Sequence, residues 1–311
     1  MERRNFTRLH EFILVGFSDV LQVQYVLLTV FFCTFNISLL AHMFIILLYR
    51  FSSNLHTPMY FFLANFSLLE ICYLSSTVPK MLINLLSQHK TITFYGYALQ
   101  MCILLLMGSA ECCMLAAMAY DRYNAICHPL LYNNIMKRVI CIMLVIGSWF
   151  AGTIVGILQT TLIFSLPFCN SNRINNFYCD IPPLMSLACT KTQFNEIIML
   201  ILTFIIVLGP FILTVISYAN IIWTIIKHHS AGMRTKAFST CTSHLIVVSM
   251  FYGSGSIMYL RPRSSYGMNE EKFLSLMYTI IAPLVNPFMY SVRNNDVKNA
   301  VKMLVVKIKI K

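Results

Sequence analysis

Seven blocks of apolar residues, separated by short polar stretches, run through the 311-residue chain. They span Tyr25–Tyr49, Met59–Leu86, Tyr97–Tyr120, Val139–Phe164, Ile197–Ile226, Phe238–Leu260 and Phe273–Val292. Each block is close to the roughly 20 residues that an α-helix needs to cross a bilayer. Only 11% of the residues are charged, compared with roughly 25% in soluble domains. We therefore expect an all-α protein, a seven-transmembrane helix bundle that forms one domain over residues 25–292, flanked by tails at 1–24 and 293–311.

Charge and covalent signals indicate that the N-terminus lies outside the cell. With the C-terminus inside, the cytoplasmic side holds a small majority of the 23 lysines and arginines, as the positive-inside rule requires. Asn5 begins an Asn-Phe-Thr glycosylation sequon, and Cys169, Cys179 and Cys189 share one loop, which suits an oxidising compartment. The first residues lack the apolar core of a signal peptide, so the first block is expected to act as the targeting signal.

The C-terminal tail has the spacing of a short amphipathic helix. Val297, Val301, Leu304, Val305 and Ile308 recur at helical spacing, and lysines are directed away from them. Such a helix would lie on the inner leaflet, held by apolar burial and by attraction to anionic membrane lipids. A frayed tail is the alternative, because short isolated helices are marginal in water. Elsewhere the net charge of +12 is scattered without an aromatic platform, which argues against a nucleic acid as partner.

Polar side chains inside the apolar blocks predict a bundle interior that is not purely apolar. Glu70 and Glu111 lie in the middle of the second and third blocks, where an unpaired charge is costly. They would form either a hydrated or ion-binding pair, or two protonated carboxyls that bond between helices. Asn286 belongs to the same set, because its amide can reach carbonyls that Pro287 leaves free. Residues 252–256 are small and polar, which allows either close helix packing or a cavity.

Catalytic and metal sites are not indicated by the sequence. Cys241 and His244 are one cysteine and one histidine at short spacing, but zinc needs three or four ligands and no partner motif follows. The chain contains neither a phosphate-binding glycine loop nor a nucleophile elbow. We expect no enzyme activity, no cofactor and no metal. A channel or transporter would favour inverted repeats or a polar pathway, and two buried acids are too few to outline one.

Six sequence motifs, in order from the first inner loop to the tail, resemble those of rhodopsin-like G-protein-coupled receptors, and most closely those of the vertebrate odorant receptors. They read LHTPMYFFLANFSLLE from Leu55, MAYDRYNAICHPL from Met118, SY at Ser217, KAFSTCTSHL from Lys236, FYG from Phe251 and PLVNPFMYSVRN from Pro283. A peptide or aminergic receptor is the nearest alternative. It is weakened by the odorant-type inner-loop motifs and by the long outer loop with three cysteines.

The resemblance implies a receptor for small volatile odorants that activates a stimulatory, olfactory-type heterotrimeric G protein and raises cyclic AMP. By matching positions, Arg122 would engage the G protein once it is released from Asp121, and inward movement of Tyr218 and Tyr290 would hold the active state. The full set of switch residues comprises Asp121, Arg122, Tyr123, Tyr218, Lys236, Asn286, Pro287 and Tyr290. The resemblance also implies the plasma membrane, in cilia of olfactory sensory neurons, with arrestin and receptor-trafficking chaperones as further partners.

Members of this family bind odorants in a cavity among the third, fifth, sixth and seventh spans. The matching positions here are Leu104, Leu105, Gly108, Ser109, Leu202, Thr203, Ile206, Tyr252, Gly255, Ser256, Tyr259 and Thr279. Mostly aliphatic walls with a few hydroxyls suit an apolar ligand with one hydrogen-bonding group. An amine is disfavoured, because Leu104 and Leu105 offer no carboxylate. Plain helix packing is the alternative for each residue, since cavities and cores are lined by the same residue types.

The outer-loop cysteines depart from the family pattern. Tyr97 stands where a cysteine usually bridges the third helix to the outer loop, so Cys179 loses its expected partner. Cys102 lies five residues further on, more than one helical turn deeper at about 1.5 Å per residue. We expect Cys169 and Cys189 to pair within the loop, and Cys179 to be free or irregularly paired.

Two further polar positions also depart from the pattern. Ala41-His42 replaces the usual Gly-Asn of the first span, and Asn124 replaces the valine that normally follows Asp-Arg-Tyr. The imidazole of His42 can supply similar hydrogen bonds, but it titrates near neutrality. Either change is expected to tune basal activity.

Overall fold

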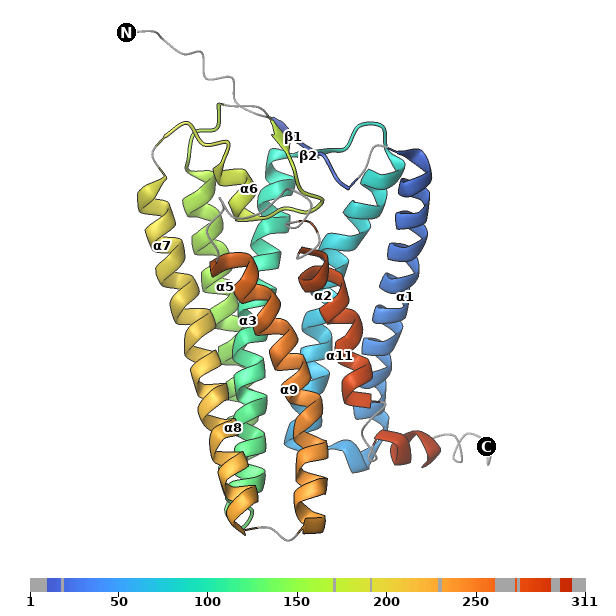
Figure 1. Cartoon of the computed structure of the whole chain (residues 1–311), viewed down its shortest axis with the longest axis vertical. Helices are drawn as coiled ribbons and strands as arrows, with labels where there is room; N and C mark the ends of the chain where they lie inside the picture. Colours follow the sequence, from blue (N-terminus) through green and yellow to red (C-terminus); the bar gives the residue numbers. More distant parts are fainter. Residues whose placement is uncertain are drawn as a thin grey trace.

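The computed structural model describes residues 10–17, 20–169, 172–190, 192–228, 231–260, 272, 275–291 and 297–303. Its long helices lie side by side along one axis (Figure 1). They are α1 (Leu21–Phe51), α2 (Pro58–Leu86), α3 (Phe94–Cys127), α5 (Arg138–Phe164), α7 (Gln193–Thr203) with α8 (Gly209–His228), α9 (Ala231–Leu260) and α11 (Ala282–Ser291). Short helices α4 (Tyr132–Ile135) and α6 (Ile181–Met185) lie in the connections, and a 3-10 turn covers Ser53–Leu55.

Each apolar block of the sequence falls within these helices, as far as the structure describes it. A π-helical turn, Phe204–Leu208, joins α7 to α8 in one rod, and a second, Met277–Ile281, leads into α11. α9 begins at Ala231, seven residues before the expected Phe238. Within the described residues, five stretches are long and apolar enough to cross a membrane: α1, α2, α3, α5 and Gln193–Lys227. The expected all-α bundle is confirmed.

α3 is the central helix of the bundle and packs against α2, α5 and α8. In the most apolar stretch of α3, 72% of the residues are buried, whereas the figure for Gln193–Lys227 is 6%. The exposed side chains of the α7–α8 rod are large and apolar, for example Phe204 and Leu213. Such a surface suits lipid, because lipid tails are as apolar as these side chains.

Two glycines let α5 approach α3 closely. A Cβ atom at Gly152 would lie 2.4 Å from the carbonyl oxygen of Leu106, and one at Gly156 would lie 2.8 Å from the carbonyl oxygen of Cys102. Small residues four apart lie on one face of a helix and allow backbone contact between helices in a membrane. The close packing of α3 and α5 therefore depends on the absence of side chains at these positions.

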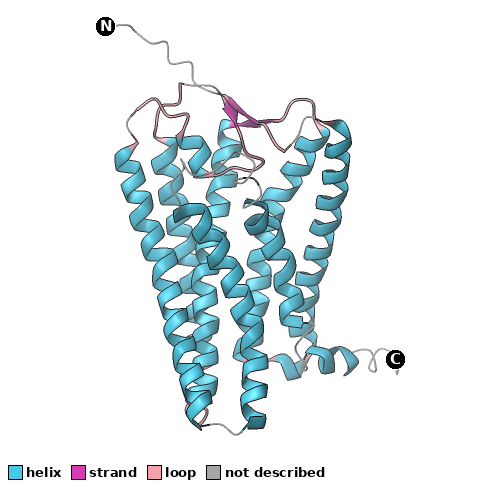
Figure 2. Ribbon diagram, in the orientation of Figure 1, coloured by secondary structure: helices cyan, strands magenta, loops and turns pink. Residues whose placement is uncertain are grey.

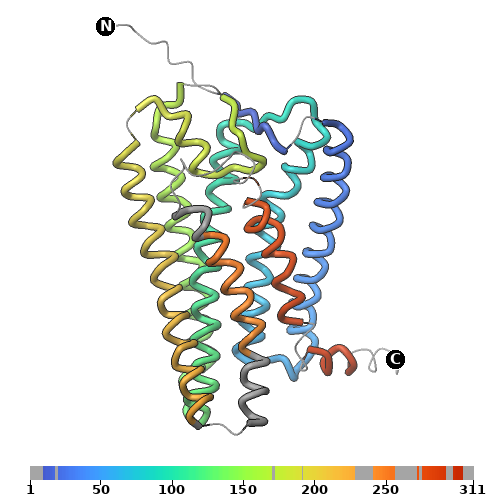
Figure 3. The backbone as a smooth tube through the Cα atoms, viewed as in Figure 1, coloured from blue at the N-terminus to red at the C-terminus, as the bar shows by residue number. Residues whose placement is uncertain are grey.

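A three-stranded sheet covers one end of the bundle, where three segments distant in sequence meet (Figures 2 and 3). β1 (Glu11–Leu14) lies between β2 (Thr91–Thr93) and β3 (Arg173–Ile174), antiparallel to β2 and parallel to β3. The sequence interpretation placed residues 1–24 in a tail and missed this strand, because four residues are too few for an alternating pattern to stand out. Phe12 and Leu14 are nonetheless buried. We call the half of the bundle nearer this sheet the sheet half, and the other the tail half.

The C-terminal tail contains a helix over residues 297–303, which lies at an angle to the bundle axis near the end opposite the sheet and points away from the bundle (Figure 1). Val297 and Ala300 are buried, and Val297 packs near Ile45 and Leu48 of α1. This part of the expected amphipathic helix is therefore helical rather than frayed. Leu304, Val305 and Ile308 lie outside the described residues.

Candidate functional site

A cavity of about 440 Å³ lies in the sheet half of the bundle. Its walls come from α3, α5, the α7–α8 rod, α9 and the second π-turn, and most of its lining side chains are aliphatic or aromatic. The volume falls within the roughly 300–1,000 Å³ of small-molecule sites. Residues 178–181 of the loop after α5 contribute to its lining on the side of the sheet. We call these four residues the cavity roof.

The structure places most of the residues assigned to ligand binding at this cavity. Those that line it are Leu104, Leu105, Gly108, Ser109, Leu202, Thr203, Ile206, Tyr252 and Gly255. The side chains of Ser256 and Tyr259 lie outside the described residues. Thr279 is a correction: it is 2% exposed but does not line the cavity, and its hydroxyl donates to Ser275 O at 2.6 Å. Its neighbour Tyr278 lines the cavity instead.

The two π-turns explain why this part of the wall differs from a regular helix. Proline has no N–H group, so Pro210 and Pro283 leave the carbonyls of Ile206 and Thr279 without their i+4 donor. Each proline lies two residues after the end of a π-turn: Pro210 after Phe204–Leu208, and Pro283 after Met277–Ile281. Freed carbonyls of this kind let a helix widen locally. The sequence analysis did not predict the register shift that presents Tyr278.

Gln159 of α5 is a lining residue that the sequence interpretation missed. It is 4% exposed and lines the cavity. It stands three residues after Gly156 and seven after Gly152, so all three share the face of α5 that packs on α3. That spacing, together with a polar residue in an apolar block, is the signal that could have identified it.

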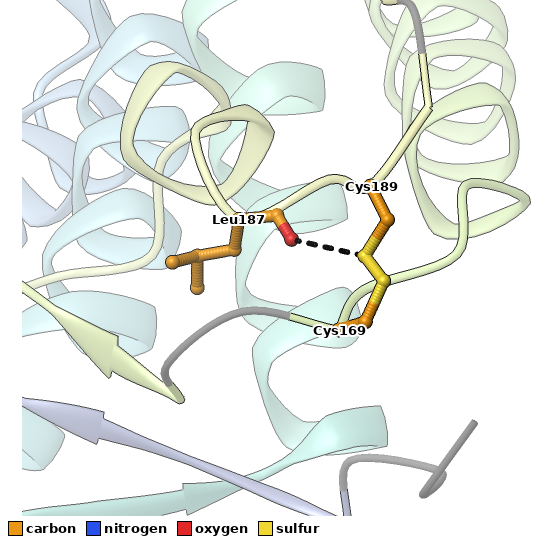
Figure 4. The surroundings of a disulfide bond; sticks show 3 residues. All are labelled: Cys169, Leu187 and Cys189. Carbon is orange, nitrogen blue, oxygen red and sulfur yellow. Dashed lines mark hydrogen bonds between the residues drawn. A yellow bond between two sulfur atoms is a disulfide. The ribbon is translucent and has the colours of Figure 1, made fainter. Parts of the chain in front are cut away.

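The outer loop contains the disulfide expected from the sequence. Cys169 and Cys189 are bonded, with their Cα atoms 5.7 Å apart (Figure 4). An isolated β-bridge between Phe168 and Ala188 lies beside them. Cys179 and Cys102 are both free thiols, and Cys179 is fully buried at the cavity roof.

The polar residues expected in the bundle interior lie together near its centre. Asn286 Nδ2 donates a hydrogen bond to Glu70 Oε1, and Glu111 interacts electrostatically with Glu70. One oxygen of each carboxyl has no partner within the described residues. His42 Nε2 lies 3.0 Å from Pro283 O. Both alternatives for the acidic pair, a hydrated or ion-binding site and two protonated carboxyls, fit this arrangement.

The Asp-Arg-Tyr triplet lies near the tail-half end of α3. Arg122 Nε is 3.8 Å from Asp121 Oδ2, and Asp121 Oδ1 accepts a hydrogen bond from Tyr132 Oη at 2.8 Å. Burial, followed by the negative charge of Asp121, holds the pKa of Tyr132 above its usual range, so this phenol stays protonated and donates. Tyr123 Oη lies 3.0 Å from His128 Nε2. Asp121 is therefore restrained by both a cation and a phenol.

Side chains from three other helices gather around Arg122. Tyr218 of α8, His244 of α9 and Tyr290 of α11 all interact electrostatically with its guanidinium. Tyr218 Oη lies 2.7 Å from His244 Nδ1, and the His244 and Tyr290 rings have centroids 6.4 Å apart. From the sequence His244 was rejected as a zinc ligand, and the resemblance placed it in the segment Lys236–His244 at the inner end of the sixth helix, without a contact to the switch residues. Its position eight residues, about two helical turns, after Lys236 was the signal that connected it to the switch.

The remaining assigned positions make local contacts or lie outside the described part. Asn124 is 2% exposed and its amide donates to Tyr120 O at 2.8 Å. Pro287 lies inside α11, and its carbonyl accepts a hydrogen bond from the Ser291 hydroxyl. The side chain of Lys236 and all of Asn5 lie outside the described residues, although the backbone of Lys236 belongs to α9.

Comparison with known proteins agrees with this architecture. Residues 31–308 match the family described as olfactory receptor. Human olfactory receptor 10A7 is 46% identical over 298 residues, which cover 96% of this chain and 94% of that protein. Human olfactory receptor 10AG1 is 45% identical over 96% of this chain and 99% of its own length. Mouse olfactory receptor 5AR1 is 44% identical over 99% of both chains.

These matches cover nearly the whole chain and confirm the resemblance drawn from the six sequence motifs. They support a multi-pass protein of the plasma membrane and a seven-transmembrane bundle. The chain therefore belongs to the olfactory receptor family, whose members are receptors rather than enzymes.

Proposed function

We propose that this receptor binds small, mainly apolar volatile odorants in the cavity of the sheet half and activates a stimulatory heterotrimeric G protein, which raises cyclic AMP. The observation that carries the proposal is the cavity itself, about 440 Å³ with mostly apolar walls. A few polar groups in its lining, among them the amide of Gln159, suit a ligand with a single polar group.

A cationic amine is a poor candidate for this cavity. Asp180 is the acidic residue among the described lining residues, but both of its carboxylate oxygens are occupied. Oδ1 accepts from Ile181 N at 2.8 Å, and Oδ2 accepts from Tyr178 Oη at 3.0 Å. An ammonium group would have to compete with these hydrogen bonds for the carboxylate, and Leu104 and Leu105 of α3 offer no second one.

Activation would be a two-state equilibrium in which the odorant binds the active form better than the resting form. In the resting form Asp121 holds Arg122. In the active form Arg122 would be released to the G protein, while Tyr218 and Tyr290 swing inward and the sixth helix moves outward from Lys236. His244 belongs to this set, because it lies between the two tyrosines at hydrogen-bond distance from Tyr218.

Orientation and cellular context follow from the same proposal. The N-terminus with Asn5 would lie outside the cell, and the tail-half end would face the cytoplasm beside membrane lipids. The receptor would reside in cilia of olfactory sensory neurons, with arrestin and receptor-trafficking chaperones as additional partners.

A cyclic AMP reporter assay against a broad odorant panel tests the proposal in cells with and without the stimulatory G protein. We expect responses only with the G protein. Ser109→Phe, which adds bulk to the cavity, should abolish them at unchanged surface expression. Thr29→Phe, at an exposed position of α1, serves as the control. Odorant-evoked current without G protein would favour a channel, and full responses in Ser109→Phe would exclude the cavity as the ligand site.

A further inference from the structure

The cavity roof is attached to α3 by the phenol of Tyr97. Tyr97 Oη donates a hydrogen bond to Asp180 O at 2.8 Å and accepts one from Asp180 N at 3.1 Å. One hydroxyl thus satisfies both backbone groups of a residue that is 3% exposed. Buried backbone groups that lose their partners are costly, so the hydroxyl stabilises the roof in this position.

The ring of Tyr97 is itself held in place by aromatic neighbours. It is fully buried, with ring centroids 5.1 Å from Phe12 of β1 and 6.2 Å from Phe164 of α5. Aromatic pairs at these distances favour defined orientations. The phenol is therefore positioned by the sheet and by α5 before it contacts Asp180.

The adjacent residue of the roof, Cys179, is a free thiol. It is fully buried, belongs to the same apolar cluster as Tyr97, and lines the cavity. Burial raises the pKa of the Cys179 thiol, the charge of Asp180 raises it further, and Lys80 opposes the effect. Because the thiolate is the reactive form, this thiol should react slowly while the roof is closed.

We propose that Tyr97 is a positioning residue that anchors the roof of the cavity to α3 without a covalent bond, so that Cys179 remains a reduced thiol in the cavity wall. The anchor is a hydrogen-bonded pair, and its strength is independent of redox conditions. Opening of the roof exposes Cys179, so the alkylation rate of this thiol measures how readily the hydrogen bonds between Tyr97 and Asp180 break. The proposal goes beyond the proposed function and does not depend on which ligand binds.

The test measures alkylation of Cys179 by N-ethylmaleimide in the full-length receptor in membranes, quantified by peptide mass spectrometry. Tyr97→Phe keeps the ring and removes the hydroxyl, and we expect Cys179 to be alkylated about tenfold faster, since local opening becomes easier. Tyr95→Phe makes the same change at a side chain that is 83% exposed, and should leave the rate unchanged. Equal rates in the two variants would overturn the proposal.

A second variant distinguishes anchoring from simple packing. In Tyr97→Cys the introduced thiol is expected to pair with Cys179 when the receptor folds in the oxidising compartment, whose disulfide oxidants take up the two electrons and two protons. Cys179 would then be protected without reductant and labelled after dithiothreitol. Protection in the wild type should not change with dithiothreitol. Labelling of Cys179 in Tyr97→Cys that is indifferent to reductant would contradict the placement of residue 97 beside the roof.

The redox state of Cys179 can also be measured in the wild-type receptor, without any variant. When it is denatured in N-ethylmaleimide without reductant, Cys179 should be fully modified, as a free thiol must be. Recovery of a disulfide-linked peptide that contains Cys179 would overturn the proposal.

Discussion

The two halves of α3 have similar residue types but different surroundings. In the sheet half, Leu104, Gly108 and Ser109 border a cavity, whereas Leu115 and Met118 in the tail half are fully buried against other side chains. The difference arises from the partner helices. In the sheet half two π-turns precede prolines and Gly255 of α9 lines the cavity, and in the tail half the side chains of Tyr218, His244 and Tyr290 lie close together. The composition of one helix therefore does not decide between a cavity and a core.

Arg122→Ala should have the largest effect, because it removes the cation that pairs with Asp121 and leaves the cavity intact. We expect odorant-evoked cyclic AMP to fall by at least about tenfold at unchanged surface expression. The cyclic AMP reporter assay measures the odorant-evoked response of each variant. Arg138→Ala, at an exposed position at the start of α5, is the matched control. A normal response in Arg122→Ala would show that the two halves are not coupled through this residue.

Gly152→Ala should disturb the contact between α3 and α5 at the level where the two halves meet. The new methyl group would meet the backbone of Leu106 at 2.4 Å, and backbone cannot move aside as a flexible side chain can. Overpacking of this kind costs about 1–3 kcal/mol, so we expect lower surface expression and a lower midpoint of thermal unfolding. Gly147→Ala, where nothing lies within 4 Å, should behave as the wild type. Equal stability of the two variants would contradict so close an approach of the two helices.

The sequence predicts the long helices because apolar blocks of membrane-spanning length leave few alternatives. It predicts the site less completely, for reasons that particular residues illustrate. Tyr278 lines the cavity in place of Thr279, because a π-turn shifts the helical register by part of a turn. Hydrophobic periodicity does not reveal such a shift. Gln159 and Tyr97 contribute through partners distant in sequence, α3 and the outer loop. Phe12 is buried only because three separate segments pair at the same end of the bundle.

Gln159→Leu should affect the sheet half alone. The substitution keeps the approximate size of the side chain and removes the amide of a buried residue that lines the cavity. For odorants with a hydrogen-bonding group we expect the half-maximal concentration to rise roughly three- to tenfold, as for the loss of one hydrogen bond. Hydrocarbon analogues should be unaffected or slightly more potent.

Dose–response curves of matched odorant pairs measure this difference. Gln193→Leu, at an exposed position in the first turn of α7, is the control. An equal shift for polar and hydrocarbon ligands would assign Gln159 to packing rather than to recognition.

Tyr132→Phe should have the smallest effect, and it acts on the tail half. It removes the hydrogen bond to Asp121 Oδ1 at 2.8 Å but leaves the ion pair between Asp121 and Arg122 at 3.8 Å. Because Tyr132 is half-buried, water can replace part of the lost interaction, so the resting state should weaken by only about 0.5 kcal/mol. Ligand-free cyclic AMP should then rise about twofold, measured with receptor number held constant. Tyr120→Phe, on an exposed phenol at the same end of α3, should leave it unchanged. A fall in basal signal in Tyr132→Phe would mean that this phenol supports the active state, and the comparison between a restrained tail half and an open sheet half would need revision.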